Sequence, residues 1–281
     1  MEQDSLTQLS DQEFHALQAF LEELIGVKLT DAKRALVISR LSKRIRELKL
    51  PNYKSYMDLV QRDSEELQVL FNRITTNVTQ FFREYHHFKY LEQTFLPRIV
   101  ADPVHNSRKI LRVWSAACST GEEPYSLAIC LQEFFKKHPG WKIQILASDV
   151  NTEALAKARA GIYDKKEING IPYNLLKTYF KMGINENAGK FKAKESLKNM
   201  ITFRQINLVA KGMYPITDPL HIIFCRNVFI YFDKQTQRDI INRFANHLHA
   251  DGVLMIGHSE SINSLNSANN WKLVGQTIYC R

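Results

Sequence analysis

Two adjacent acidic residues, Glu122 and Glu123, lie at the position in this sequence that is best suited to bind a ligand. An apolar run, residues 110–114, precedes them and is typical of a buried parallel strand. Only small and turn-forming residues, 115–121, separate the run from the acids, and Pro124 then opens a segment with helical spacing. A strand, a tight small-residue loop and a helix N-terminus form the arrangement that holds nucleoside-containing cofactors in open α/β sheets.

The acidic pair indicates which cofactor such a loop would bind. A helix N-terminus favours anions because of its dipole, so a loop built for pyrophosphate would present bare amide groups there. Two carboxylates would repel a phosphate, and they suit a ligand with a cationic end, such as the sulfonium and ammonium groups of S-adenosylmethionine. The alternative interpretation is an ordinary strand–helix turn with acidic residues in the first turn of the helix.

Asp149 supports the cofactor hypothesis because of its place in the chain. It follows a second apolar run, residues 143–147, and lies 28 residues after Gly121. An acid at the carboxyl end of that strand can accept hydrogen bonds from both ribose hydroxyls. The alternative role of Asp149 is to cap the next helix, although Asn151 could do that instead.

The elements alternate from residue 110 to the end of the chain, and this alternation predicts the fold. Strands and helices follow one another, but the last two expected strands have no helix between them. We therefore expect an α/β protein with a doubly wound, mostly parallel sheet and an antiparallel terminal hairpin, the arrangement of class I methyltransferases. The expected strands lie at 110–114, 143–147, 201–206, 221–225, 253–257 and within 271–280, and expected helices include 153–160 and 235–249.

The ends of the third and fourth strands should open onto the same crevice, because ligands bind at the carboxyl ends of parallel strands. Residues 205–208 supply a side-chain amide and a backbone N–H that could read the edge of an adenine. Residues 225–233 follow the fourth strand and face the same crevice.

The chain divides into three predicted parts. Residues 1–92 show helical periodicity and predict a small all-α domain, and the polar stretch 93–108 with its prolines predicts a linker. Residues 109–281 form the predicted catalytic domain. Within it, residues 162–200 exceed what a loop needs and alternate apolar with basic residues, so we expect an inserted antiparallel β-subdomain. An exposed strand edge there could bind a partner peptide.

Positive charge is concentrated in one predicted helix of the first domain. The whole chain has a net charge of +9, and the segment 28–49 alone carries eight basic residues against two acidic ones. On a helix, four of these basic residues fall beside one apolar face. A charge run is often a solvated face. Because the charge is concentrated in one segment here, a docking surface for an acidic partner is an equally good interpretation. The predicted docking residues are Lys33, Arg40, Lys43 and Arg44.

Composition excludes several classes of protein. No apolar run approaches the roughly 18 residues of a membrane helix, and the polar N-terminus lacks the features of a signal peptide. The four cysteines are dispersed, as expected of reduced thiols in a cytoplasmic protein. We expect no metal site, because His86 and His87 lack companion cysteines or histidines and fit a helix.

Five segments together resemble one family, the chemotaxis receptor methyltransferases of the CheR family. The resemblance covers nearly the whole chain, and its two longest motifs, VWSAACSTGEEPYS and IFCRNVFIYFD, are the most specific. It implies methylation, dependent on S-adenosylmethionine, of glutamate side chains on the cytoplasmic helices of bacterial methyl-accepting chemotaxis receptors, with S-adenosylhomocysteine as the second product. The motifs are TTNVTQFFRE (75–84), VWSAACSTGEEPYS (113–126), ASDVNTEAL (147–155), IFCRNVFIYFD (223–233) and GHSES (257–261).

The resemblance also implies site residues. Arg83 and Tyr231 are the candidates for orienting the substrate carboxylate, and Arg83 could instead bind the cofactor's own carboxylate. A receptor C-terminal peptide is a further implied partner, at the β-subdomain, and we expect a monomer that binds no nucleic acid and does not insert into a membrane. The implied cofactor contacts are Asn77, Thr79, Arg83, Ala117, Glu123, Asp149, Asn207, Leu208, Asn227 and Val228.

Two other functions use the same sequence features. A nucleic-acid methyltransferase would explain the basic segment, but the Asn/Asp-Pro-Pro-aromatic motif typical of DNA amino-methylating enzymes is replaced here by Arg226-Asn227-Val228-Phe229. A non-catalytic protein that binds S-adenosylmethionine in signalling would share the fold, and the intact Glu123, Asp149 and Arg83 argue against a decayed site.

Overall fold

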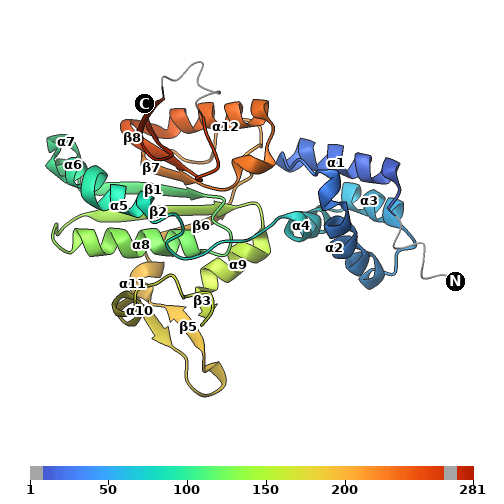
Figure 1. Cartoon of the computed structure of the whole chain (residues 1–281), viewed down its shortest axis with the longest axis horizontal. Helices are drawn as coiled ribbons and strands as arrows, with labels where there is room; N and C mark the ends of the chain where they lie inside the picture. The colour runs from blue at the N-terminus through green and yellow to red at the C-terminus, as the bar shows by residue number, and fades with distance from the viewer. Residues whose placement is uncertain (1–8, 263–270) are drawn as a thin grey trace.

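The N-terminal helices form a small all-α domain beside the rest of the chain (Figure 1). In the computed structural model, residues 9–262 and 271–281 are described. The first helix begins at a capping box between Ser10 and Glu13, and it ends at Gly26, whose left-handed φ of 69° stops it. The apolar faces of the helices enclose one core. The elements are α1 (Asp11–Ile25), η1 (Asp31–Lys33), α2 (Arg34–Glu47), α3 (Tyr53–Arg62) and α4 (Ser64–Ile74).

A seven-stranded sheet in the order β6-β2-β1-β7-β8-β10-β9 forms the centre of the second unit. Five strands are parallel, and β10 runs antiparallel to both of its neighbours. The predicted doubly wound sheet with an antiparallel edge hairpin is confirmed. The strands are β1 (Ile110–Ala116), β2 (Lys142–Asp149), β6 (Ile201–Gln205), β7 (Leu220–Cys225), β8 (Leu248–Ile256), β9 (Lys272–Gly275) and β10 (Ile278–Cys280).

Helices cover both faces of this sheet, α8 (Glu122–Phe135) and α9 (Thr152–Ala160) on one and α12 (Lys234–His247) on the other (Figure 1). Successive residues of β1 serve opposite cores, because side chains alternate along a strand. Val113 packs with α8, whereas the ring of Trp114 lies 5.2 Å from that of Phe244 in α12. This packing on both faces fixes the sheet, and the carboxyl ends of its parallel strands lie side by side.

The predicted linker at 93–108 and the domain boundary at 92 are wrong. The stretch is helical, and Leu96 and Ile99 are fully buried against the sheet. Asp102 and Pro103, taken as breakers, start a new helix, because the Asp102 carboxylate accepts hydrogen bonds from the N–H groups of the first turn. The core of the all-α domain ends at Ile74. The helical segments are α5 (His86–Tyr90), η2 (Leu91–Phe95), α6 (Leu96–Ala101) and α7 (Pro103–Arg108).

The predicted insertion is a small three-stranded antiparallel sheet in the order β3-β5-β4, projecting from the face that carries α8 (Figure 1). Phe180 at the start of β4 anchors it, since its ring lies 5.8 Å from that of Phe81. The elements are β3 (Ile162–Asp164), α10 (Tyr173–Tyr179), β4 (Phe180–Met182), η3 (Asn185–Asn187), β5 (Lys190–Ala193) and α11 (Glu195–Lys198).

Polar contacts join the all-α domain to the carboxyl edge of the large sheet. The backbone N–H of Lys28 donates to the carbonyl of Tyr231 at 2.8 Å. The side-chain amide of Asn207 donates to the carbonyl of Leu24 at 2.6 Å. Within the described part of the chain, no helix combines the length and apolar character needed to cross a membrane.

Candidate functional site

A cleft lies where the all-α domain meets the carboxyl ends of the large sheet's strands. It encloses about 1200 Å³, including space open to solvent. All eleven residues predicted to be catalytic or to bind the cofactor line it, although they come from segments far apart in the sequence. They are Asn77, Thr79, Arg83, Ala117, Glu123, Asp149, Asn207, Leu208, Asn227, Val228 and Tyr231.

Asp149 is the buried acid at the centre of this lining. Its Oδ2 accepts the backbone N–H of Ser119 at 2.8 Å, and its Oδ1 accepts that of Asn151 at 2.9 Å. Burial raises the pKa of Asp149, and these backbone hydrogen bonds partly oppose the rise. Each oxygen keeps a further lone pair, which suits a pair of ribose hydroxyls. Asn151 caps α9, so Asp149 does not serve as its cap.

The loop after β1 approaches Asp149 through an unusual backbone. Ala117 and Ser119 both have a positive φ, of 61° and 51°, and Gly121 has a φ of 99°. A Cβ on Gly121 would come within 2.8 Å of Ala158 in α9, so only glycine fits there. The small residues noted in the sequence thus let the loop fold tightly over the strand ends.

The two acids after this loop, Glu122 and Glu123, have different surroundings, and only Glu123 lines the cleft. Glu122 is not part of the cleft lining, and its carboxylate accepts the Thr120 hydroxyl at 2.7 Å while burial raises its pKa. Glu123 lines the cleft, but its Oε1 accepts the Ser115 hydroxyl and its Oε2 accepts Arg226 Nε, both at 2.7 Å. The expectation that two carboxylates face a cationic ligand is therefore wrong for Glu122, and the charge of Glu123 is matched within the protein.

Arg226 lines the cleft but is absent from the residues predicted from the sequence. It is 7% exposed, lines the cleft, and donates to the carbonyl of Arg83 at 2.5 Å in addition to Glu123. A signal was present, because an arginine directly after the apolar strand Leu220–Cys225 must be paired if it is buried. The partner cannot be identified from the sequence, since Glu123 is 103 positions away.

The two candidate catalytic residues lie at the mouth of the cleft. Arg83 is partly exposed, and its Nη1 donates to the carbonyl of Val78 at 3.2 Å, which leaves further guanidinium N–H groups to bind a ligand. Tyr231 is also partly exposed, and Lys33 Nζ lies 4.6 Å from the centre of its ring. Asn207 lines the cleft as well, but its amide is engaged by Leu24 and by the N–H of Val209, which limits the expected adenine contact.

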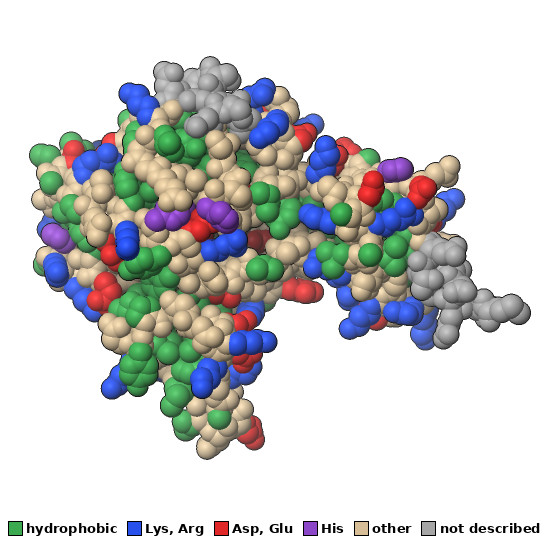
Figure 2. All heavy atoms as spheres, viewed as in Figure 1, with side chains coloured by type: hydrophobic (Ala, Val, Ile, Leu, Met, Phe, Trp, Pro, Cys, Tyr) green, Lys and Arg blue, Asp and Glu red, His purple; other side chains and the backbone are tan. Residues whose placement is uncertain are grey.

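The predicted docking residues, Lys33 at the end of η1 and three residues of α2, differ in their availability. Arg44 is held by Glu66, at 2.6 Å, and is not free to meet a partner. Arg40 donates to three carbonyls at the end of α4, those of Arg73, Ile74 and Thr75. Lys43 is exposed, and Lys33 lies at the cleft over Tyr231. Figure 2 shows Lys and Arg side chains gathered on the all-α domain.

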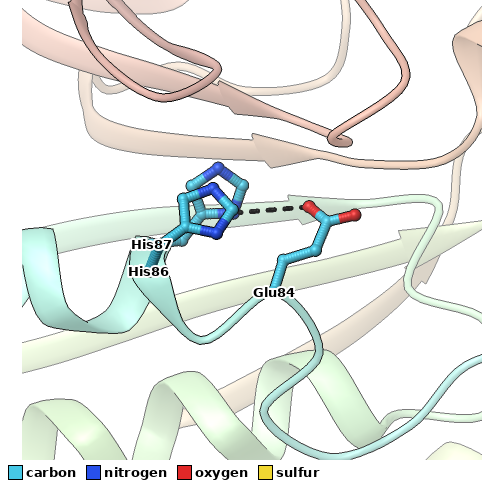
Figure 3. Close-up of side chains that lie close together, drawn as sticks. All are labelled: Glu84, His86 and His87. Atoms are coloured by element: carbon cyan, nitrogen blue, oxygen red, sulfur yellow. Dashed lines mark ion pairs between the residues drawn. The ribbon is translucent and has the colours of Figure 1, made fainter.

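Glu84, His86 and His87 lie together next to the cleft (Figure 3) and are the one group among the described residues with metal-ligand spacing. Arg226 lies against two of them, because its Nη1 is 3.2 Å from His87 Nδ1 and 3.6 Å from Glu84 Oε2. A guanidinium in that place opposes a metal cation.

Two family models match adjacent parts of the chain. The model described as "CheR methyltransferase, all-alpha domain" matches residues 12–75, and the one described as "CheR methyltransferase, SAM binding domain" matches residues 77–280. The chain belongs to the CheR methyltransferase family. The boundary between the two matches coincides with the end of the all-α core at Ile74.

Similar curated proteins carry the same description over almost their whole length. The "Chemotaxis protein methyltransferase" of Salmonella typhimurium is 41% identical, covering 96% of this chain and 90% of that protein. The Escherichia coli protein of that name is also 41% identical, covering 96% and 91%, and "Chemotaxis protein methyltransferase 2" of Pseudomonas aeruginosa is 40% identical, covering 95% and 92%. Among solved structures, the glycopeptide N-methyltransferase MtfA complexed with S-adenosylmethionine matches at 14% identity with a TM-score of 0.36, covering 71% of this chain and 65% of that chain.

This CheR-family chain is an enzyme that uses S-adenosylmethionine for methylation in chemotaxis, as the family and its relatives show. The geometry of the cleft fits the cofactor. The Asp149 carboxylate keeps acceptor capacity toward the cleft, and the tight loop at Gly121 brings backbone close to it. Neither feature requires a metal.

Proposed function

We propose that this enzyme forms methyl esters on glutamate side chains of the cytoplasmic helices of chemoreceptors. The observation that carries the proposal is the convergence of eleven candidate residues on one cleft beside the basic all-α domain. A nucleic-acid substrate is disfavoured, because the excess of positive charge is concentrated in the segment 28–49, and two of its arginines, Arg40 and Arg44, are bonded within the protein.

The proposed cofactor contacts divide by segment. S-adenosylmethionine, when bound, supplies a methyl group made electrophilic by its sulfonium. We assign the ribose to Asp149 and the adenine side to Asn207 and Leu208, which follow the next strand. The remaining contacts come from the segment after α4, the loop after β1, the first turn of α8 and the residues after β7, and comprise Asn77, Thr79, Ala117, Glu123, Asn227 and Val228.

The substrate needs orientation rather than a base. A glutamate side chain with a pKa near 4.3 is ionised at neutral pH, so no proton has to be removed. Arg83 is the proposed partner of this carboxylate, because its fork can hold two oxygens at once, and Tyr231 is proposed to hydrogen-bond it. Alignment in a partly dry cleft can contribute on the order of 7–11 kcal/mol.

The receptor is proposed to dock through its acidic helical region on α2. Lys33 and Lys43 are the members of the predicted set best placed for this, with Arg40 in part, whereas Arg44 is committed to Glu66. A receptor C-terminal peptide could add to the sheet of β3, β4 and β5, since β3 and β4 are its edges. We further propose that the protein acts in the cytoplasm as a monomer.

Radiolabelled cofactor and receptor-rich membranes test the proposal. We expect label to enter the receptor band and to be released by alkali, because methyl esters hydrolyse in base and N-methyl groups do not. Substitution of the receptor's candidate glutamates with alanine should abolish the labelling. Alkali-stable label, or label in nucleic acid, would contradict the proposal.

A further inference from the structure

Glu84 has a buried carboxylate for which the proposed chemistry has no use. Its side chain is only 8% exposed, although it lies directly after Arg83. Its Oε1 accepts three hydrogen bonds, from the backbone N–H of His258 at 3.2 Å, from His258 Nδ1 at 2.8 Å and from Asn227 Nδ2 at 3.2 Å. One oxygen therefore joins the segment before α5 to the ends of β7 and β8.

The second oxygen, Oε2, faces Arg226 at 3.6 Å and accepts no hydrogen bond. The neighbouring His87 is neutral, because burial and the charge of Arg226 lower its pKa to about 3. The Glu84–His87 contact drawn as a dashed line in Figure 3 is thus not a pair of charges. Burial would raise the pKa of Glu84, but the His258 and Asn227 hydrogen bonds and the Arg226 charge outweigh it and lower that pKa.

Glu84 also takes part in an unusual backbone conformation. Phe82 and Glu84 have left-handed φ values of 53° and 56° on either side of Arg83, and Asn227 has one of 58°. Such conformations are uncommon for residues other than glycine and persist where surrounding contacts hold them. Here the contacts are known, because Arg226 binds the Arg83 carbonyl and Glu84 binds Asn227.

We propose that Glu84 is a positioning residue for methyl transfer, an inference that rests on the proposed function. Its carboxylate fixes the backbone of Arg83, on the substrate side, relative to Asn227, on the cofactor side. It acts through Asn227 and through Arg226, which it shares with Glu123. Reaction rate is sensitive to such an alignment, since a misplacement of about 1 Å can cost about 100-fold.

The test is Glu84→Gln in the full chain, measured with a receptor fragment that contains the methylated helices. Glutamine can still accept the hydrogen bonds of His258 and Asn227, so the cofactor Kd from calorimetry should change by less than about threefold. The charge facing Arg226 is lost, so kcat should fall by about tenfold or more. An unchanged kcat, or a Kd that worsens as much as kcat, would overturn the proposal.

Asp251→Asn is the matched control. Asp251 also bonds a histidine, His105 at 2.9 Å, but it lies near the start of β8, away from the cleft lining. The Asp251→Asn variant should keep the wild-type kcat. A loss of kcat equal to that of Glu84→Gln would show a general effect of removing a carboxylate that bonds a histidine. If Glu84→Gln does not fold, His258→Ala decides, with an expected fall in kcat of about threefold at unchanged cofactor Kd.

Two further outcomes separate the competing explanations. If chelation with EDTA lowers kcat of the wild type but not that of Glu84→Gln, Glu84 is a metal ligand and the positioning role is overturned. If the wild-type protein transfers no methyl group to the receptor fragment, the proposed function itself fails. An active wild type with an equally active Glu84→Gln variant removes only the role of Glu84.

Discussion

At the scale of single residues, Asp149 is the most direct test of the cofactor site. Its carboxylate is buried, holds two backbone N–H groups and keeps acceptor capacity toward the cleft. Asp149→Ala should weaken S-adenosylmethionine binding by about tenfold or more, because charge-assisted hydrogen bonds are lost. Calorimetry measures this, with Asp164→Ala, a surface carboxylate 2.6 Å from Lys190, as the control. Equal affinity in a folded Asp149 variant would contradict the assignment.

Arg83 offers a second test at this scale. Arg83→Lys keeps the charge but loses the planar fork that can hold a carboxylate by two hydrogen bonds. We expect kcat for receptor methylation to fall by about tenfold while the protein remains folded. Arg159→Lys is the control, because Arg159 is exposed and also bonds a carbonyl, that of Phe203 at 3.3 Å. Full activity of the Arg83 variant would mean that a point charge is sufficient.

The sequence allowed the identities of the cleft residues to be predicted but not their pairings. The role of Asp149 could be predicted from the sequence, because an acid at the end of a strand has a limited number of roles. The pairing of Glu123 with Arg226 could not, because it joins residues that only the sheet order brings together. Glu122 has a local partner, the Thr120 hydroxyl, and it is the turn of α8 that directs Glu123 rather than Glu122 to the cleft.

At the scale of elements, a chain of histidines links four segments at the start of the strands. Arg112 N–H donates to His221 Nδ1, so His221 Nε2 carries the proton and donates to His105 Nδ1 at 3.3 Å. His105 Nε2 then donates to Asp251. The ring of His249 lies 4.4 Å from that of His221. This chain ties α7 to β1, β7 and β8.

Acid should therefore destabilise the fold through His221. Burial and the electrostatic effect of the neighbouring His249 and His105 lower the pKa of His221 to about 3, from an ordinary value of 6.5. The unfolded chain binds the proton first, so stability falls as the pH drops from about 6.5 toward 3, by about 1.4 kcal/mol for each pH unit. His221→Asn keeps an acceptor for Arg112, and urea unfolding between pH 4 and 6 should show a shallower pH dependence. An unchanged slope would mean that other groups dominate.

Element boundaries could be predicted where the spacing of apolar residues is regular. The prediction was wrong where residues that cap a helix are also typical of loops. The predicted bounds of the strands and of the helices α9 and α12 agree with the structure to within a few residues, except that β8 begins at Leu248 and not at 253. The segment 93–108 was not predicted correctly, because Asp102 and Pro103 are read equally well as a loop or as a helix start. Only the burial of Leu96 and Ile99 distinguishes the two.

At the scale of the whole molecule, the uneven charge can be tested with the residues of α2 that remain exposed. Reversing Arg40 and Arg44 would break contacts with the α4 carbonyls and with Glu66. Lys43→Glu with Arg46→Glu avoids this, since both side chains are exposed. The apparent KM for receptor should rise several-fold at low salt and the effect should shrink as salt is added, because the Debye length is only about 8 Å at physiological ionic strength.

The control for this charge reversal is Lys137→Glu, an exposed residue just beyond α8. It should leave the KM for receptor unchanged, and cofactor affinity should be the same in all of these proteins. Equal receptor kinetics for the α2 variant at low salt would favour a merely solvated face. A simultaneous loss of cofactor affinity would indicate misfolding of the domain.

The contacts between the all-α domain and the catalytic domain bear on whether these domains can be exchanged between homologues. The Lys28 tie uses a backbone N–H and a backbone carbonyl, and Asn207 also meets a backbone carbonyl, that of Leu24. Substitutions at 24, 28 and 231 other than proline leave the main-chain groups in place. Side chains also meet across this joint, since Asn72 Nδ2 donates to Thr152 Oγ1 at 2.9 Å. The all-α half of one homologue should therefore fit onto the catalytic half of another where such pairs are kept, which makes hybrid enzymes with a transplanted receptor preference accessible by joining the halves near residue 76.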